Sequence, residues 1–335
     1  MFKNKTILIT GGTGSFGRKF VETLLKNHNN FKKLIIFSRD ELKQYEIEQE
    51  LKTKKYDISN IRFFLGDVRD KDRLNRALKN VDIVVHAAAL KQVPAAEYNP
   101  DEFIKTNVIG AQNLIEASIN NNVQKLVALS TDKAAAPINL YGATKLCSDK
   151  LFIAAKNYSG KNKIQFSIVR YGNVLESRGS VIPLFKKQMK EGVLGITDES
   201  MTRFAITLEE GVEMVLWVIQ NSLGGEIFVP KIPSFKILDL AKMMSPKSRI
   251  KKIGIRKGEK IHEDLITTSD SISTYDIGKY YVILPDNSFE TVSKFKKKFK
   301  ICKKVKENFH YNSSDNSDFI DGEILKKYLK KNSII

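Results

Sequence analysis

The chain is poor in the residues that build disulfide frameworks and metal clusters. Its 335 residues include two cysteines, Cys147 and Cys302, and four histidines that lie far apart. Two cysteines are too few for a disulfide framework, and neither has the paired spacing of a zinc site. We therefore expect free thiols and no catalytic metal.

Long hydrophobic runs are also missing. No stretch reaches the roughly 18 to 20 apolar residues that span a membrane. The first apolar run, residues 6–10, is too short for the core of a signal peptide and lacks a cleavage site. These absences predict a cytoplasmic protein with no membrane partner.

Acidic residues are outnumbered by basic ones, which gives a formal net charge of +18. Such a charge can attract nucleic acid, an anionic membrane or an anionic small substrate. The lysines are spread along the chain, and the one dense run, residues 294–306, interleaves them with apolar residues. That run is typical of the solvated face of a packed segment, so we expect no nucleic-acid partner.

Short apolar runs alternate with stretches of helical periodicity, and the runs occupy residues 6–10, 34–37, 61–65, 81–85, 126–129 and 166–169. This alternation predicts an α/β fold with a Rossmann-type, doubly wound parallel sheet. After residue 172 the pattern loosens, and we interpret helical spacing at 208–220 and an apolar run at 227–229 as parts of a smaller lobe. We expect a cofactor-binding domain over 1–172 and a mainly substrate-binding lobe over 173–335, with some segments returning to the sheet.

A glycine-rich loop, residues 11–17, lies where the first predicted strand meets the first predicted helix. Gly11, Gly14 and Gly17 allow a tight turn, close approach to a pyrophosphate, and packing of the helix on the strand. Glycine spacing alone is a weak signal, and its position between strand and helix makes it a strong one. The predicted dinucleotide contacts in this loop are Gly11, Thr13, Gly14, Ser15, Phe16 and Gly17.

The tip of the second predicted strand carries a hydroxyl and a guanidinium where a site for NAD more often has a carboxylate. Arg39 suits a ribose 2′-phosphate, with Ser38 and Lys43 as helpers, so we expect NADP. In the alternative interpretation, Arg39 only pairs with Asp40 or Glu41 at the start of a helix.

Two further strand ends add to the predicted cofactor site. Asp67 and Val68 follow the third strand and are placed to contact the adenine, while Ala87, Ala88 and Ala89 follow the fourth and leave room beside the backbone. Lys91 points toward the same edge, where it meets substrate or the nicotinamide end. In the alternative interpretation, Lys91 is an ordinary surface lysine.

Four ionisable residues of two short segments surround one expected reaction centre. Tyr141 and Lys145, four residues apart, share one face of a helix, and the ammonium would favour the phenolate that takes a proton. Asp132 and Lys133 lie just past an apolar strand, at the edge where open parallel sheets bind ligands. They offer a second acid/base pair, although a surface ion pair is the alternative.

These motifs together resemble the extended short-chain dehydrogenase/reductase family, over nearly the whole chain. The resemblance rests on residues 10–17, the alanines at 87–89, Ser130-Thr131, and residues 141–145. Segments 38–43, 88–91, 130–133, 171–174, 201–204 and 258–263 further resemble the 5-inverting UDP-N-acetylglucosamine 4,6-dehydratases. Those enzymes begin the route to pseudaminic acid, a sugar of bacterial surfaces and flagellins, and commonly form homo-oligomers.

The resemblance implies catalytic roles that the spacing alone does not. Tyr141, with Lys145 and the Thr131 hydroxyl, would deprotonate the 4-hydroxyl of UDP-N-acetylglucosamine as hydride passes to NADP. Lys133 would take the proton at carbon 5, and Asp132 would protonate the departing 6-hydroxyl. Retaining 4,6-dehydratases carry an Asp-Glu pair here, so Lys133 argues for inversion. A lysine base also requires a lowered pKa, from burial or from a cation such as Lys91.

The same resemblance implies a set of substrate contacts in the second lobe, with the arginines facing diphosphate or ribose and with His262 structural. The set is Asn173, Val181, Thr197, Arg203, Arg256 and Glu259. The chain departs from the family pattern at Gln92, Ala136, Glu176, Ala205 and Lys257. None of these removes a catalytic group, although Glu176 and Lys257 alter the expected charge and shape of the substrate pocket.

Three other functions stay open at this stage. A nucleotide-sugar 4-epimerase would share the glycine loop and Tyr141 with Lys145, but it has no need of Asp132 and Lys133. A retaining 4,6-dehydratase would dehydrate the same sugar without inversion at carbon 5, but Lys133 stands where such enzymes carry a glutamate. A noncatalytic NADP-binding regulator, touching RNA through its basic surface, would not need Thr131, Tyr141 and Lys145 together.

Overall fold

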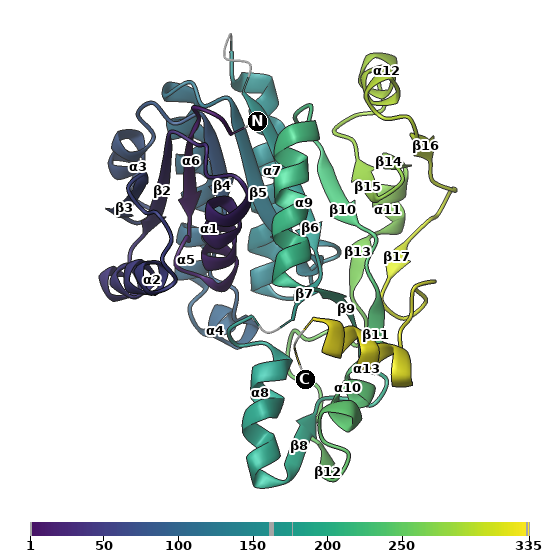
Figure 1. Ribbon diagram of the computed structural model, residues 1–335. Helices are drawn as coiled ribbons and strands as arrows, with labels where there is room; N and C mark the ends of the chain where they lie inside the picture. Colours follow the sequence, from purple (N-terminus) through teal and green to yellow (C-terminus); the bar gives the residue numbers. More distant parts are fainter. Residues whose placement is uncertain (1, 161–163, 176, 333, 335) are drawn as a thin grey trace.

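A ten-stranded sheet forms the centre of the protein (Figure 1). The computed structural model describes residues 2–160, 164–175, 177–332 and 334. In spatial order the strands are β16 (Lys303–Lys304), β14 (Thr274–Asp276), β15 (Tyr280–Ile283), β10 (Ile227–Pro230), β6 (Gln165–Tyr171), β5 (Lys125–Thr131), β4 (Ile83–His86), β1 (Thr6–Thr10), β2 (Lys33–Ser38) and β3 (Ile61–Leu65).

The strands from β10 to β3 run parallel, and β15, β14 and β16 add an antiparallel edge. The order 3-2-1-4-5-6 is that of a doubly wound dinucleotide-binding sheet, which confirms the predicted fold class. Every residue of β1 is buried, and its β-branched side chains suit a strand covered on both faces. The strand order reverses between β1 and β4, since β2 and β3 lie on one side of β1 and β4, β5 and β6 lie on the other. The carboxyl ends of β1 and β4 therefore border a crevice.

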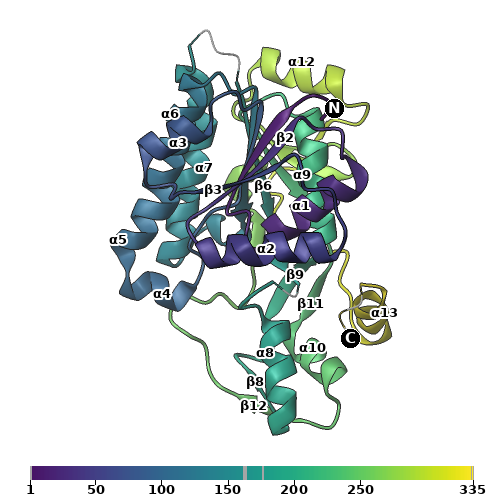
Figure 2. The ribbon, with the colours of Figure 1, turned by 60° about the vertical axis from the view of Figure 1, so that its left-hand side comes forward.

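Helices cover both faces of the sheet (Figure 2). On one side α1 (Ser15–Asn27) packs against α9 (Leu208–Asn221), and on the other α6 (Gly110–Asn120) lies between α3 (Lys71–Ala77) and α7 (Leu140–Tyr158). The remaining helices of this part are α2 (Glu41–Thr53), α4 (Val93–Tyr98), α5 (Pro100–Phe103), the π-helix η1 (Ile104–Ile109) and the 3₁₀ turn η2 (Asp132–Ala134).

A smaller lobe lies beyond the carboxyl ends of the strands, with a hydrophobic core of its own that includes Phe185, Phe235 and Leu240. Its strands are β7 (Asn173–Val174), β8 (Val193–Ile196), β9 (Thr202–Ile206), β11 (Ser234–Lys236) and β12 (Arg249–Lys252). Its helices are α8 (Val181–Gln188), the 3₁₀ turn η3 (Met189–Glu191), α10 (Ile237–Met244) and α13 (Gly322–Lys331). The remaining elements are β13 (Asp264–Ile266), which pairs with β17 (Tyr311–Asn312), and the helices α11 (Thr268–Ser271) and α12 (Phe289–Lys298).

The segments at 208–220 and 227–229 belong to the sheet layer, so assigning them to the lobe was wrong. A capping box between Thr207 and Glu210 starts α9 as the chain leaves β9 of the lobe. Helix α9 then packs on α1, and β10 pairs parallel to β6. The periodicity of α9 indicates a buried face, but it does not indicate that this face packs against the sheet.

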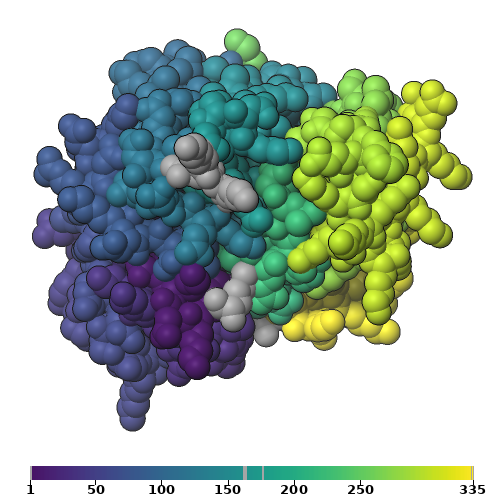
Figure 3. All heavy atoms as spheres, turned by 90° about the horizontal axis from the view of Figure 1, so that it is seen from above, coloured from purple at the N-terminus to yellow at the C-terminus, as the bar shows by residue number. Residues whose placement is uncertain are grey.

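The lysine-rich segment packs as expected of a solvated face. Phe295 of α12 is 2% exposed, and Phe299 stacks near it and near Trp217, while the lysines of α12 face outward. Figure 3 looks onto the end of the molecule where the parallel strands begin, with this segment in yellow-green beside the teal and green parts. The basic residues therefore surround an aromatic cluster.

A buried glutamate at the start of β10 predicts a pH-dependent stability. Glu226 is fully buried, and burial raises its pKa to about 7, although the backbone amide of Leu223 donates to its carboxylate and opposes the shift. Its pKa is higher folded than unfolded, so the folded protein holds the extra proton and loses stability as pH rises from about 4.5 to 7.

We expect Glu226→Gln to remove this dependence. Between pH 5 and pH 8, the free energy of unfolding measured with urea should fall by on the order of 2 to 3 kcal/mol more in wild type than in the variant. Parallel losses in the two proteins would contradict the assignment.

Candidate active site

The carboxyl ends of the parallel strands border a cleft of about 510 Å³. Its lining combines most of the predicted cofactor residues with the predicted catalytic ones: Gly11, Thr13, Gly14, Ser15, Phe16, Gly17, Lys43, Ala87, Ala88, Ala89, Lys91, Thr131, Asp132, Lys133, Tyr141 and Lys145. The structure thus gathers residues separated by more than a hundred positions at one edge of the sheet.

The glycine loop is shaped for close approach. Gly11 has φ +65°, and a Cβ there would lie 2.8 Å from the backbone nitrogen of Ala88. At Gly17 a Cβ would lie 2.4 Å from the Gly12 carbonyl oxygen, so only glycine lets α1 pack this closely. Gly14, the N-cap of α1, has no side chain to occupy the first helix amides. This cradle fits a pyrophosphate at a helix N-terminus.

An adjoining cavity of about 310 Å³ is lined by Ser38, Arg39, Lys43, Asp67, Val68 and the three alanines Ala87, Ala88 and Ala89. Arg39 is half exposed and lies 3.7 Å from Asp67, not against Asp40 or Glu41. Asp40 instead caps α2 and pairs with Lys43 at 2.5 Å. The Ser38 hydroxyl is buried and accepts from Gln44. Arg39 is therefore the most accessible cation at the tip of β2.

The unit β5–η2–α7 carries all five predicted catalytic residues. The Asn139 side chain caps α7 by accepting from the Gly142 amide at 2.8 Å, which places Tyr141 in the first turn. Lys145, one turn on, donates to the Leu129 carbonyl at 2.8 Å. Tyr141 and Lys145 are both buried beside the strand end.

The pKa of Tyr141 runs against the expectation of a ready phenolate. Burial raises it to about 12, and neither the Thr131 hydroxyl nor the charge of Lys133 offsets that. Burial also lowers the pKa of Lys145, partly opposed by Asp149. In the protein as it stands, Tyr141 is a neutral phenol at pH 7.

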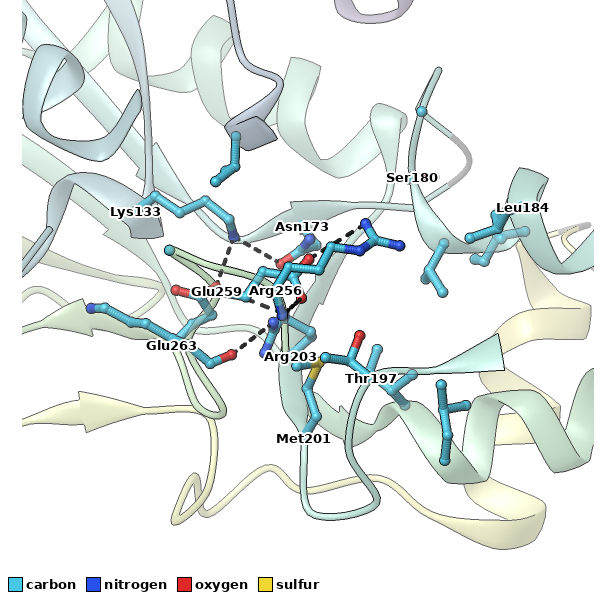
Figure 4. Close-up of a pocket in the computed structure, with 18 of the residues that line it drawn as sticks. Lys133, Asn173, Ser180, Leu184, Thr197, Met201, Arg203, Arg256, Glu259 and Glu263 are labelled. Atoms are coloured by element: carbon cyan, nitrogen blue, oxygen red, sulfur yellow. Dashed lines mark hydrogen bonds and ion pairs between the residues drawn. The ribbon is translucent and has the colours of Figure 1, made fainter. Parts of the chain in front are cut away.

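Asp132 and Lys133 form a partly buried ion pair rather than a surface one. Asp132 is fully buried, and its Oδ1 accepts from the Thr131 hydroxyl at 2.8 Å and lies 3.0 Å from Lys133 Nζ. Asn173 Oδ1 accepts from the same ammonium at 3.4 Å. Figure 4 shows the Lys133 ammonium directed at the adjacent Asn173 side chain.

The surroundings of Lys133 shift its pKa in the opposite direction from the one that a lysine base requires. Burial disfavours the ammonium, but Asp132 and a third residue, Glu263, outweigh burial and raise the pKa. Lys91, by contrast, has a lowered pKa because of burial and the charge of Lys133. The two carboxylates therefore favour the ammonium form of Lys133.

A third cavity of about 230 Å³ opens from Lys133 into the lobe. It is lined by six of the predicted substrate residues, Asn173, Val181, Thr197, Arg203, Arg256 and Glu259, whereas Lys91 lies in the cofactor cleft. Lys133 and Asn173 line both spaces and mark their junction.

The two arginines differ in availability. Arg203 is buried and donates to the carbonyls of Thr202, Lys260 and Ile261 at 2.7 to 3.0 Å. Arg256 is half exposed, with Glu259 Oε1 at 3.6 Å. Arg256 is therefore the freer of the two for an anionic ligand.

Glu263 is the residue that our sequence reasoning missed. It is 2% exposed, lines the lobe cavity, and lies 3.1 Å from Lys133 Nζ. Residues 258–263 contributed to the family resemblance, but spacing gave no sign that the last of them reaches the turn after β5. The adjacent residue, His262, forms a 2.8 Å hydrogen bond with the Thr202 hydroxyl. It does not line any of the three cavities.

The departures from the family pattern fall mostly beside the site. Lys257 is exposed and 4.0 Å from Glu97, and Ala205 is buried in the core of the lobe. Gln92 lines the cofactor cleft, and Ala136 has φ +45° just after the catalytic turn. Glu176 lies outside the described residues.

The described residues include no group of three His, Cys, Asp or Glu side chains that could hold a metal ion. No helix in that part of the chain has the length and apolar character needed to cross a membrane.

Comparisons with curated proteins point to one family. A family model described as "Polysaccharide biosynthesis protein" matches residues 7–285. A UDP-N-acetylglucosamine 4,6-dehydratase (inverting) of Campylobacter jejuni subsp. jejuni is 53% identical over 94% of this chain and 94% of its own length. A UDP-glucose 4-epimerase of Rickettsia akari is 45% identical over 85% and 84% of the two chains.

Solved structures share the architecture. Pen from Bacillus thuringiensis matches with a TM-score of 0.89 and 35% identity, over the full length of both chains. DesIV, a dTDP-glucose 4,6-dehydratase from Streptomyces venezuelae solved with NAD, matches with a TM-score of 0.66 and 23% identity, over 76% of this chain and 86% of that one. With the family model covering most of its length, the chain belongs to the polysaccharide biosynthesis protein family.

Proposed function

We propose that this protein is a lyase that dehydrates UDP-N-acetylglucosamine to a UDP-2-acetamido-2,6-dideoxy-4-keto-hexose with inversion at carbon 5. One observation carries the proposal: a second acid/base pair, Asp132 with Lys133, adjoins Tyr141 and Lys145 where the two ligand cavities meet. A simple oxidoreductase needs only the tyrosine and lysine. The similarity to the inverting dehydratase of C. jejuni supports the same reaction.

The cofactor of the proposal is NADP, and the residues present fit it. The glycine cradle would hold the pyrophosphate, Asp67 and Val68 would border the adenine, and Arg39 would meet the 2′-phosphate. When bound, NADP supplies the acceptor for the carbon 4 hydride and returns that hydride to carbon 6.

The side chains divide the proton transfers. Tyr141 would take the proton of the 4-hydroxyl, with the Thr131 hydroxyl and Lys145 beside it. Its raised pKa means that nearby positive charge must help the phenolate form. The 4-ketone then acidifies the proton at carbon 5, and Lys133, as a neutral amine, takes that proton. The ammonium so formed passes a proton to Asp132, 3.0 Å away, and Asp132 gives it to the leaving 6-hydroxyl. Reprotonation of carbon 5 from the other face completes the inversion.

The lobe cavity is proposed to bind the nucleotide-sugar. Arg256 is exposed enough to meet the diphosphate. Arg203 already donates to three backbone carbonyls, so it would stabilise the wall of the cavity rather than bind phosphate. Asn173 and Lys133 would meet the sugar at the junction of the two cavities.

The test is proton NMR of the purified protein with UDP-N-acetylglucosamine in deuterated water. We expect a 6-deoxy-4-keto sugar inverted at carbon 5, with solvent deuterium at that carbon in the first product. Early release of the uninverted ketone would identify a retaining dehydratase. Conversion to UDP-N-acetylgalactosamine would identify the 4-epimerase, which the similarity to the R. akari protein makes the second candidate.

Cofactor choice gives a separate prediction. Arg39→Asp should weaken NADP by about a hundredfold and NAD far less, because it exchanges the partner of the 2′-phosphate for a like charge. Binding is measured by titration of protein fluorescence, with Lys297→Asp on the exposed face of α12 as the control that makes the same change in charge. Equal losses for both cofactors would remove the phosphate argument.

The setting of the reaction is proposed with it. The product would enter pseudaminic acid synthesis and flagellin glycosylation, in the cytoplasm, where UDP-sugars are made. We also expect a homo-oligomer, which sedimentation velocity can check. RNA retained by the purified protein at low salt, and not by a charge-matched control, would instead favour the noncatalytic regulator.

A further inference from the structure

Glu263 meets the catalytic turn from a distant part of the chain. It immediately precedes β13, and its Oε1 lies 3.1 Å from Lys133 Nζ. The residue is 2% exposed, and its Oε2 has no hydrogen-bond partner among the described residues. A buried carboxylate oxygen without a partner is costly, so a merely structural role leaves this side chain unexplained.

The surrounding lobe holds Glu263 in place. Its backbone amide donates to the Ser313 hydroxyl at 2.9 Å, and the Ser313 amide donates to its carbonyl at 2.9 Å. Arg203 fixes the preceding residues through the carbonyls of Lys260 and Ile261, and its Nε lies 3.7 Å from Glu263 Oε1. The carboxylate is thus aimed at Lys133 by backbone contacts on both sides (Figure 4).

Lys133 therefore lies between two carboxylates. Asp132 Oδ1 is 3.0 Å from its ammonium on one side, and Glu263 Oε1 is 3.1 Å away on the other. The charged or titratable groups that act on this pair are Asp132, Arg203, Lys91 and Tyr141. Arg203 partly offsets the two negative charges.

Resting on the proposed dehydration, we propose that Glu263 is a positioning residue that holds Lys133 as an ammonium and so controls when this lysine becomes the base at carbon 5. The ammonium must lose one proton before it can accept the proton of carbon 5. A carboxylate in contact with the ammonium stabilises the charged form and delays that loss to higher pH. After neutral Lys133 has taken the carbon 5 proton, Asp132, 3.0 Å from the ammonium, relays that proton to the leaving 6-hydroxyl.

Glu263→Gln keeps the shape of the side chain and an oxygen that can accept from Lys133, but it removes the charge. Loss of an opposite charge at this distance shifts a titration by about one to two pH units toward acid. We expect the wild-type dehydration rate to keep rising through pH 9. The variant should level off one to two units earlier, with carbon 4 oxidation, followed at 340 nm, retained.

Glu226→Gln is the matched control, because it makes the same substitution at an equally buried glutamate at the opposite end of the sheet. Its pH–rate profile should follow that of wild type. Glu263→Asp keeps the charge but shortens the reach, so a smaller shift in the same direction is expected, and this variant serves if the glutamine variant does not fold. A Glu263→Gln profile identical to that of wild type would overturn the proposal.

A second readout does not depend on turnover. Brief reductive methylation between pH 7 and 11, quantified on the peptide containing Lys133, reports how much of the amine is neutral. The half-reaction pH should fall by one to two units in Glu263→Gln and stay unchanged in Glu226→Gln. If wild type does not convert UDP-N-acetylglucosamine, the proposed function fails, and the labelling still decides whether Glu263 controls Lys133. No shift in labelling would overturn the inference whatever the substrate.

Discussion

Replacing Lys133 with alanine should slow release of the keto-sugar by about a hundredfold to ten-thousandfold, the range expected for loss of a general base. The first hydride transfer should survive, because Tyr141, Lys145 and the glycine cradle are untouched. Mixing enzyme, NADP and UDP-N-acetylglucosamine should therefore give a rise in absorbance at 340 nm without product. The structure explains the separation, since Lys133 Nζ contacts Asp132, Asn173 and Glu263.

The substitution also removes the cation that contacts the buried carboxylates of Asp132 and Glu263, so stability must be measured alongside. Urea unfolding of Lys133→Ala separates a folded, inactive enzyme from an unfolded one. Lys297→Ala, on the exposed face of α12, removes the same charge far from the site and should behave as wild type. Normal product release by Lys133→Ala would exclude Lys133 as the base.

Alanine at Gly142 should disable the enzyme through the backbone. A Cβ on Gly142 would lie 2.1 Å from the Lys133 carbonyl oxygen and 3.0 Å from Pro137 Cβ, so the catalytic turn and α7 must separate. Displacements of about 1 Å at a reaction centre cost on the order of a hundredfold in rate. We expect at least that loss in dehydration, together with about 1 to 3 kcal/mol of stability from overpacking.

The sign of the stability change makes this prediction sharp. Glycine to alanine within a helix ordinarily stabilises it by up to about 1 kcal/mol, so destabilisation points to the clash. Ala154→Ser, a small enlargement at an exposed position of the same helix, is the control and should change neither stability nor rate. A stabilised, fully active Gly142→Ala would mean that the turn can move without consequence.

Local patterns were enough to predict the sheet and the cofactor edge. Residues 6–10 and 126–129 read as buried strands because they are short and apolar, and the glycine at 11 gains meaning from its place after a strand. Since parallel strands end at a common edge, the order of motifs predicted that Asp67, Ala87 and Thr131 would lie near one another, and they do line adjoining cavities.

Long-range contacts were beyond that reasoning. Helix α9 carries a helical pattern, but nothing local to it states that it packs on α1. Glu263 reaches Lys133 through the pairing of β13 with β17 and the hydrogen bonds of Ser313, which no spacing encodes. The pKa shifts of Lys133 and Tyr141 could not be predicted for the same reason, because burial and neighbouring charges depend on the assembled site.

The proposed catalytic groups and the proposed sugar-binding groups come from separate stretches of chain. Residues 125–158 form one strand, turn and helix that supply every proposed proton-transfer residue, whereas the lobe cavity is lined mainly by residues after 172. Substitutions in the later stretch, other than at Glu263, can therefore reshape the lobe cavity while this strand, turn and helix stay as they are. Relatives that differ mainly after residue 172 are thus expected to differ in the ligand they accept more than in the reaction they catalyse.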